Sequence, residues 1–242
     1  MRIFLVAPED ISGDSVTIEG PDVHHIKNVL RLKAGDEIFV ADGTAKFRCK
    51  IDQVTDEVIK ATILEKLALT GLPSINIKLA QAIPKGRKMD DIIRMACELG
   101  VVEVIPVMTE RCIVKFDDQS ALNKTDRWRE IAKSAGKQSR ASSSAEVLEL
   151  TALETLAETK NAELRIVMWE DETTTTLKQV LDTRKKPKSI LILIGPEGGL
   201  TADEVELLTK AGFIAASFGT SILRTETAGV AVISALLYHY GG

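Results

Sequence analysis

The sequence predicts an α/β protein in which a small β-rich domain precedes a larger domain built on a parallel sheet. The N-terminal part, up to about residue 70, contains short strand-like segments separated by glycine and proline turns. From about residue 73 onward, apolar runs of strand length alternate with segments of helical periodicity, which is typical of βαβ units. A turn-type cluster at 70–73 marks the boundary, so we expect domains at 1–70 and 73–242.

Composition favours an ordinary globular protein and excludes several classes. The chain has 242 residues, of which 45% are hydrophobic and 27% charged, enough to form a sizeable core. The formal net charge of -4 predicts that any nucleic-acid contact comes from local basic patches. No apolar run approaches the roughly 18 residues of a membrane span, so we expect no membrane association.

Cysteine and histidine usage favours a cytoplasmic protein without a metal. Cys49, Cys97 and Cys112 are odd in number and widely spaced, which indicates reduced thiols rather than disulfides. The three histidines lack metal-ligand spacing, so no metal site is expected.

The N-terminal segment predicts five short strands and one helix. We expect a helix over 21–32 with Val23, Ile26, Val29 and Leu30 on one face. His24, Lys27 and Arg31 would then project together on another side, where they could contact RNA phosphates or a base, or simply be solvated. The five strands, which suggest a small barrel, are predicted at 3–6, 15–18, 37–41, 46–54 and 58–64.

The second domain begins as a βαβ unit. A strand at 75–82 leads through a basic turn, Lys85 to Lys88, into a helix at 90–99 and a buried strand at 101–107. Between Arg111 and Arg140 eight basic residues face four acids, which suggests either an RNA surface or a solvated helix face. Trp128, in a helix expected at 126–139, has the spacing of a core residue. Further along we expect a short helix at 150–156, a strand at 164–169 and a helix at 176–183.

The most informative stretch is 189–228. Its unbroken apolar run at 190–194 predicts a strand covered on both faces, followed by the glycine-rich turn GPEGG at 195–199. Thr201 and Glu204 have capping-box spacing, so a helix should begin there and lead to a strand at 213–218. A polar cluster, Arg224 to Thr227, precedes a helix at 229–238 that is apolar almost all round. Two loops at the carboxyl ends of parallel strands predict a small-molecule pocket.

These motifs resemble a known family. GPEGG with the downstream Thr201 and Glu204, and ILRTETA at 222–228, are similar to the C-terminal motifs of the RsmE-type 16S ribosomal RNA uridine N3-methyltransferases of the SPOUT class. The resemblance extends to His24-His25 with 29–31, to 85–88 and to Glu110-Arg111, so it covers most of the chain.

The resemblance implies a PUA-like RNA-binding barrel followed by a trefoil-knotted methyltransferase domain. It also implies a homodimer, for which the apolar helix at 229–238 could supply an interface as well as a core, and a uridine of 16S rRNA in the small ribosomal subunit as substrate. A cradle made mainly of backbone suits S-adenosyl-L-methionine, and no Ser-His-Asp, Cys-His or Walker motif competes with this interpretation.

Three sets of site residues follow. Arg224 is expected to hold a uracil oxygen or anion, with Glu197 or Glu226 as proton acceptor, although Arg224 and Glu226 could instead only pin the loop. The cofactor is expected at Met168, Trp169, Gly195, Glu197, Gly199, Leu223, Thr225 and Ala228. RNA contacts are expected from His24, Lys27, Arg31, Lys85, Arg87, Lys88, Arg111 and Arg140.

Two alternatives stay open. A non-catalytic RNA-binding or ribosome-assembly protein with a vestigial pocket would bind RNA but no S-adenosylmethionine. A dehydrogenase would bind a nicotinamide cofactor, but the glycine spacing is not G-x-G-x-x-G. The chain also departs from the family at Ser221, where many relatives have arginine, and in the serine-rich loop 142–144, where relatives often have proline; both affect expected RNA contacts.

Overall fold

The computed structural model describes residues 3–67, 75–114, 116–138 and 145–241. The chain forms two compact units, Met1–Leu72 with Gly136–Ser144, and Pro73–Ala135 with Ala145–Gly242. The predicted serine-rich loop at 142–144 and the predicted boundary cluster lie outside the described residues.

In its described residues the first unit contains a six-stranded sheet, a short 3-10 helix, η1 (Pro8–Asp10), and a longer helical segment over 21–29. Its strands have the order β1-β4-β5-β6-β3-β2. The strand missing from the sequence prediction is β2, whose two residues pair antiparallel with β3. The strands are β1 (Ile3–Leu5), β2 (Ile11–Ser12), β3 (Ser15–Glu19), β4 (Glu37–Ala41), β5 (Lys46–Val54) and β6 (Val58–Leu67).

The prediction of one regular helix over 21–32 is wrong. The segment is a four-residue α-helix, α1 (Pro21–His24), followed by a π-helical turn, η2 (His25–Val29). A π-turn rotates the chain relative to an α-helix, so residues beyond it leave the predicted face. Val23 and Ile26 are buried as expected, but Val29 and Leu30 are 58% and 40% exposed.

The second unit is a parallel sheet covered on both faces by helices. Its strand order is β10-β8-β7-β12-β11-β13, and β9 pairs with β8. These strands are β7 (Asn76–Ala82), β8 (Glu103–Met108), β9 (Glu146–Val147), β10 (Thr151–Ala152), β11 (Leu164–Met168), β12 (Ser189–Ile194) and β13 (Ile214–Ala216).

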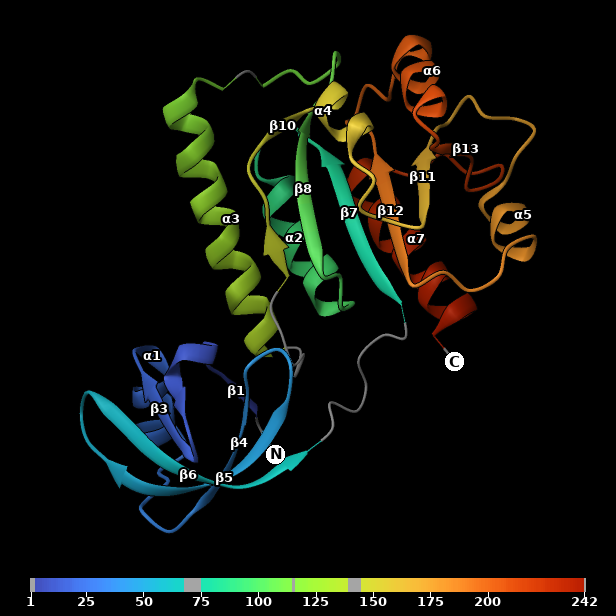
Figure 1. Cartoon of the computed structure of the whole chain (residues 1–242). Coiled ribbons are helices and arrows are strands. Elements are labelled where there is room, and N and C mark those ends of the chain that lie inside the picture. Colours follow the sequence, from blue (N-terminus) through green and yellow to red (C-terminus); the bar gives the residue numbers. More distant parts are fainter. Residues whose placement is uncertain (1–2, 68–74, 115, 139–144, 242) are drawn as a thin grey trace. The chain divides into compact units, whose positions relative to one another are not determined.

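Strand β12 confirms that its apolar run is covered on both sides. Ile190, Ile192 and Ile194 belong to one apolar cluster, while Leu191 and Leu193 belong to another. The first cluster includes residues of α2 (Lys88–Glu98), α3 (Asp118–Gln138), α5 (Leu177–Asp182) and α7 (Thr225–Tyr240). The second includes residues of α4 (Leu153–Glu158) and α6 (Ala202–Lys210). Figure 1 shows this unit with α7 against the central strands β7 and β12, and α2 packs against α7.

Several boundaries differ from the sequence prediction. Helix α3 begins at Asp118, eight residues before the predicted start at 126, and Trp128 on it is buried as predicted. The segment predicted as a helix at 150–156 starts instead as β10, whose Thr151 pairs with Val107, and becomes α4 only at Leu153. Strand β13 is shorter than the predicted strand at 213–218.

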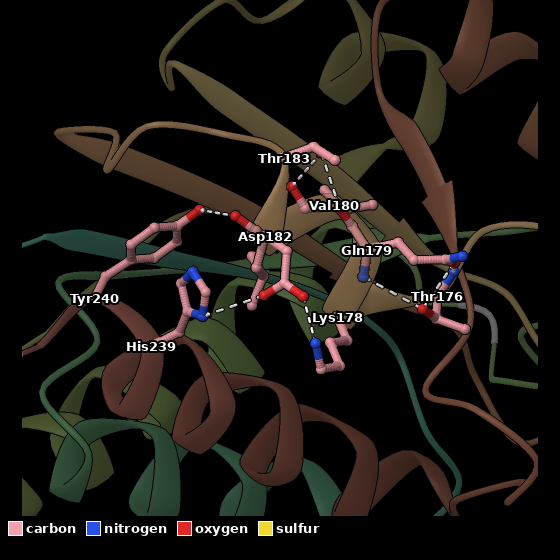
Figure 2. A network of polar contacts seen from close by, with 9 residues as sticks. Thr176, Lys178, Gln179, Val180, Asp182, Thr183, His239 and Tyr240 are labelled. Carbon is pink, nitrogen blue, oxygen red and sulfur yellow. Dashed lines mark hydrogen bonds and ion pairs between the residues drawn. The ribbon is translucent and has the colours of Figure 1, made fainter.

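A polar network closes α5 onto the end of α7. Tyr240 donates its hydroxyl to the Leu181 carbonyl at 3.3 Å, and His239 Nδ1 lies 4.0 Å from an oxygen of Asp182. Figure 2 shows Asp182 between His239 and Lys178, with which it also forms an ion pair. This network joins the C-terminal end of α7 to α5, and the N-terminus of α7 lies at the opposite end of the helix.

The three cysteines are buried free thiols, as the sequence predicted for reduced thiols. Cys49, Cys97 and Cys112 are buried and unpaired. Burial raises the pKa of the Cys49 and Cys97 thiols to about 11, so both stay protonated at neutral pH. No helix in the described parts of the chain is long and apolar enough to cross a membrane.

Candidate active site

A pocket lies where parallel strands β11 and β12 end. Glu170 follows β11, Gly195 follows β12, and the segment 217–223 connects β13 to α7. This is the edge of an open α/β sheet at which ligands bind, as the sequence predicted. The pocket is lined by Met168, Trp169, Glu170, Ile194, Gly195, Pro196, Gly199, Ser217, Phe218, Gly219, Ser221, Ile222, Leu223, Thr225, Ala228 and Val232.

The GPEGG turn is built so that bare backbone faces the pocket. Gly199 has φ +67°, and a Cβ added there would lie 1.8 Å from Oε1 of Glu170. A Cβ on Gly195 would lie 3.2 Å from Cγ of Leu200. At both positions a Cβ would meet a neighbouring side chain, so only glycine lets these neighbours pack directly against the turn.

The predicted capping box at Thr201 and Glu204 is confirmed and does more than cap α6. The Thr201 hydroxyl accepts from the Glu204 amide at 3.3 Å, and Glu204 Oε2 accepts from the Thr201 amide at 2.9 Å. The other carboxylate oxygen, Oε1, accepts from the Glu110 amide at 2.7 Å. Glu204 thereby ties the segment after β8 to the start of α6.

The polar cluster before the apolar helix is part of that helix. The sequence predicted a loop up to 228, but α7 begins at Thr225 with Arg224 as its N-cap residue. Threonine, glutamate and alanine are all acceptable in a first helical turn, and Glu226 there interacts favourably with the positive end of the helix dipole. Arg224 is exposed.

A buried chain of hydrogen bonds joins this helix start to the glycine turn. Thr225 donates its hydroxyl to the Gly195 carbonyl at 2.7 Å and accepts from Nε2 of Gln81 at 3.0 Å. Gln81 is fully buried at the end of β7 and also donates to the Ala82 carbonyl at 3.0 Å. The end of strand β7 thus positions the start of α7 through Gln81 and, through Thr225, the glycine turn.

An ion-pair cluster makes a second connection between the glycine turn and the start of α7. The Lys88 ammonium lies 2.9 Å from Oε1 of Glu197 and 3.1 Å from Oε2 of Glu226. Glu197 also accepts from the Lys85 amide, at 3.2 Å and 3.1 Å for its two oxygens.

These contacts shift three pKa values. Burial acts to raise the pKa of Glu197, but the hydrogen bonds from Lys88 and the Lys85 amide outweigh it, so the pKa lies below its ordinary value. The pKa of Glu226 is lowered by its own backbone amide and by Lys88, against a smaller effect of burial. The pKa of Lys88 is raised by hydrogen bonds to Glu197 and then Glu226. All three groups are therefore charged at neutral pH.

The expected RNA-contact residues fall into separate groups. In the second unit Lys85 and Arg87 are exposed, while exposed Arg111 donates from Nη1 to the Gly198 carbonyl at 2.8 Å. In the first unit Lys27 pairs with Asp56 at 2.6 Å, and exposed Arg31 has a left-handed backbone with φ 55°. His24, also exposed, ends α1, so the regular helix from which its grouping with Lys27 and Arg31 was inferred is absent. Arg140 lies outside the described residues.

Sequence reasoning missed several residues at the pocket. Glu170 directly follows a strand at the ligand-binding edge of the sheet, and Gln81 is a polar residue at the same end of an apolar strand. Their positions at the carboxyl ends of predicted strands could have identified both residues from the sequence. The lining residues of 217–222 carried no comparable signal, because short polar loops occur at many strand ends.

Two family models match the chain. One is described as an RNA methyltransferase PUA domain and matches residues 18–64. The other is described as an RNA methyltransferase domain and matches residues 71–237.

Curated relatives and solved structures cover nearly the whole chain. "Ribosomal RNA small subunit methyltransferase E" of Bacillus subtilis is 33% identical, covering 92% of this chain and 89% of the relative. The protein of the same name from Aquifex aeolicus is 31% identical over 98% of this chain and 99% of its own.

Among solved structures, a ribosomal RNA small subunit methyltransferase E from Neisseria gonorrhoeae, bound to S-adenosyl methionine, superposes with a TM-score of 0.85. It is 31% identical and the match covers 100% of this chain and 98% of that one. A putative methyltransferase from Legionella pneumophila in complex with the same cofactor gives a TM-score of 0.82 at 27% identity, covering 98% and 96% of the two chains. With an N-terminal PUA-like domain and an α/β methyltransferase domain matched in order, this chain belongs to the family of small-subunit ribosomal RNA methyltransferases E.

Proposed function

We propose that this protein transfers the methyl group of S-adenosyl-L-methionine to N3 of one uridine in 16S rRNA of the small ribosomal subunit. The observation that carries the proposal is the pocket at the ends of β11 and β12, walled by glycine backbone on one side and by the start of α7 on the other. Its position matches the ligand edge of an open α/β sheet.

The residues present fit the cofactor. Gly195 and Gly199 line the pocket and present only backbone atoms to it, so a flat adenine could approach their backbone. Trp169 lines the pocket, and its Nε1 is buried without a hydrogen-bond partner among the described residues. We propose that the predicted residues that line the pocket hold the cofactor: Met168, Trp169, Gly195, Gly199, Leu223, Thr225 and Ala228. Glu197, also predicted, does not line the pocket, since its carboxylate pairs with Lys88, so it would support the site from outside. We add Glu170, a pocket carboxylate suited to a hydroxyl or ammonium group.

The bound cofactor supplies an electrophilic methyl on a sulfonium, and the chain must prepare the nucleophile. When the N3–methyl bond forms, the carbon–sulfur bond breaks and the N3 proton has to leave. We propose that the exposed guanidinium of Arg224, at the start of α7, stabilises the negative charge on the uracil. Glu197 or Glu226 accepts the proton. Because Lys88 lowers the pKa of both carboxylates, each is a weak base, and the larger contribution to catalysis comes from the Arg224 guanidinium.

For RNA we propose contacts from both units. His24, Lys27 and Arg31 belong to the PUA-like part, residues 1–70, and Lys85, Arg87, Arg111 and Arg140 to the basic segments assigned to the methyltransferase part, residues 73–242. The exposed lysines and arginines among them suit phosphate oxygens. An enzyme acting on ribosomal RNA works in the cytoplasm.

The finer fold assignment is a trefoil knot in the second unit. It is supported by the return of α7 across β7 and β12 after the chain has passed through β13, and by the bond from Thr225 to Gly195 that joins two segments far apart in sequence. Knots are rare among folds, so an experimental trace of the chain is the direct test.

Calorimetry with S-adenosylmethionine and with its demethylated product separates this proposal from the alternatives. Binding of both, together with methylation of unmodified small subunits, is expected. RNA binding without cofactor binding would favour the non-catalytic assembly protein, and affinity for a nicotinamide cofactor instead would favour a dehydrogenase.

A further inference from the structure

We infer that Lys88 is a positioning residue of the cofactor pocket, which holds the glycine turn and the start of α7 together, and not a phosphate contact. The inference rests on the proposed cofactor site and deepens it. Lys88 is the first residue of α2 and belongs to the basic segment that by sequence alone resembles an RNA contact.

The ammonium of Lys88 joins the two loops directly. Glu197 lies in the glycine turn after β12, and Glu226 lies in the first turn of α7. Both carboxylates lie within 3.1 Å of the same Nζ atom, and their side chains are only 25% and 26% exposed. Neighbours of these two residues, Gly195, Gly199, Thr225 and Ala228, line the pocket. A change in the spacing of the two carboxylates would therefore be passed to the neighbouring residues that line the pocket.

The connection belongs to a larger support from the end of β7 and the start of α2. Gln81 donates to Thr225, the Lys85 amide donates to Glu197, and Lys88 contacts both carboxylates. Thr225 in turn donates to the Gly195 carbonyl. One segment of the chain, 81–88, thus contacts both the glycine turn and the start of α7. Gln81 contributes to these contacts in the buried interior, and Lys85 and Lys88 contribute near the surface.

Charge explains what the lysine does there. Without Lys88 two carboxylates would face one position with no cation between them, and their repulsion would push the loops apart. An RNA phosphate at Lys88 would meet the same two carboxylates, because the ammonium is already shared between them. Lys85 and Arg87 have exposed side chains and are the better phosphate contacts of this segment.

The test combines cofactor affinity with the salt dependence of RNA binding. For Lys88→Met we expect the Kd for S-adenosylmethionine to rise about three- to tenfold by calorimetry, with Lys88→Arg closer to wild type. The slope of log K against log salt for a small-subunit RNA fragment should not change. Lys210→Met is the matched control, since Lys210 forms a comparable ion pair with Glu206 at 2.6 Å on the outer surface of α6.

A compensating variant makes the test specific. In Lys88→Met with Glu226→Gln one of the facing charges is removed, so part of the cofactor affinity should return. A lost phosphate contact would not return in that variant. The inference is overturned if Lys88→Met leaves the cofactor Kd unchanged, or if it lowers the RNA salt slope by about one with no rescue by the second change. Absence of cofactor binding by the wild-type protein would overturn the proposed function instead.

Discussion

At Gly199 the backbone conformation and the surrounding space both oppose a side chain. Its φ of +67° disfavours L-residues, and its missing Cβ is replaced by the carboxylate of Glu170. Because Glu170 is exposed and can move, a side chain at position 199 would displace Glu170 in the pocket. The unfavourable backbone conformation of such a side chain would lower the stability of the fold.

We expect Gly199→Ala to destabilise the protein by about 1 kcal/mol and to weaken S-adenosylmethionine binding as well. Gly13→Ala is the control, because Gly13 has φ +59° and open space around it in the first unit. It should cost similar stability and leave cofactor affinity unchanged. Equal cofactor affinity of the two variants by calorimetry would remove Gly199 from the site.

Arg224 carries the electrostatic part of the proposed reaction. Arg224→Ala should lower kcat for methylation of unmodified small subunits by about 10²- to 10³-fold, because a preorganised cation opposite the developing charge is lost. The cofactor Kd should stay within about threefold, since Thr225 and not Arg224 lines the pocket. Near-normal turnover would mean that Arg224 serves only to start α7. Arg94→Ala, on the exposed side of α2, is the matched control.

The lowered pKa values of Glu197 and Glu226 predict a specific dependence on pH. A carboxylate whose folded pKa lies below 4.5 stabilises the folded state above about pH 4.5, and this contribution is lost as the pH falls through the folded pKa. The raised pKa of Lys88 contributes below about 10.5 and is lost as the pH rises further.

The difference in thermal midpoint between wild type and Lys88→Met should therefore be constant from about pH 6 to 9 and shrink below about pH 4.5. Taking the difference cancels the pH-dependent contributions of other carboxylates with lowered pKa values, such as Glu206 and Glu172, because both proteins contain them. A difference that persists unchanged to pH 3 would show that Lys88 acts through packing and not through its charge.

Among individual residues, those next to a recognisable turn were predictable and those defined by tertiary partners were not. Gly195, Gly199 and Thr225 follow directly from the glycine turn and the polar cluster, and the structure places all three at the pocket. The contacts of Lys88 could not be predicted, because its partners Glu197 and Glu226 are brought near only by the order of strands in the sheet. The local sequence is the same basic turn whether Lys88 contacts a phosphate or positions the pocket.

At the scale of elements, the strands and helices were predictable in kind and less so in their ends. The run at 190–194 and the capping box of α6 were unambiguous, because period and capping chemistry agree. The π-turn at His25–Val29 was not predictable, since an extra residue per turn leaves no compositional mark. The early start of α7 was missed because its first turn is polar while the rest is apolar.

Arg165 shows how two helix ends are held. Its guanidinium donates to the Thr159 carbonyl just after α4 at 2.8 Å and to the Ala211 carbonyl at the end of α6 at 2.6 Å. It also lies 5.0 Å from the ring centroid of Phe213. A charged donor shared by two helix C-termini satisfies carbonyls that lack partners within the helices.

We expect Arg165→Met to lower the free energy of unfolding by about 1–3 kcal/mol. Urea unfolding followed by tryptophan fluorescence measures this, since both tryptophans, Trp128 and Trp169, belong to the second unit. Lys178→Met, which removes an exposed pair with Asp182, should change it by less than about 0.5 kcal/mol. Similar midpoints for the two variants would contradict the role given to Arg165.

At the scale of the whole molecule, we propose a homodimer that uses the outer side of α7. The inner stripe, Val232, Ile233 and Leu236, is fully buried within the chain, so the core accounts for only part of this apolar helix. Tyr238 is 93% exposed. Light scattering should give twice the chain mass of 26.4 kDa, and Tyr238→Asp should give the mass of one chain. A single-chain mass for the wild type at micromolar concentration would contradict the proposal.

The fold class was predictable at this scale, but the order of strands was not. Apolar runs alternating with helices indicate a parallel sheet, yet nothing local tells that β12 inserts between β7 and β11. That insertion brings Gln81, Gly195 and Thr225 together.

Pairing of Asn76 with Ser189 also governs when the catalytic part can mature on a translating ribosome. Until β12 is synthesised, the edge of β7 that pairs with it has no neighbouring strand. At roughly 5–20 residues per second, synthesis of the intervening chain takes several seconds. Ability to bind the methyl donor should arise late and abruptly during synthesis, only after the last helix has left the exit tunnel.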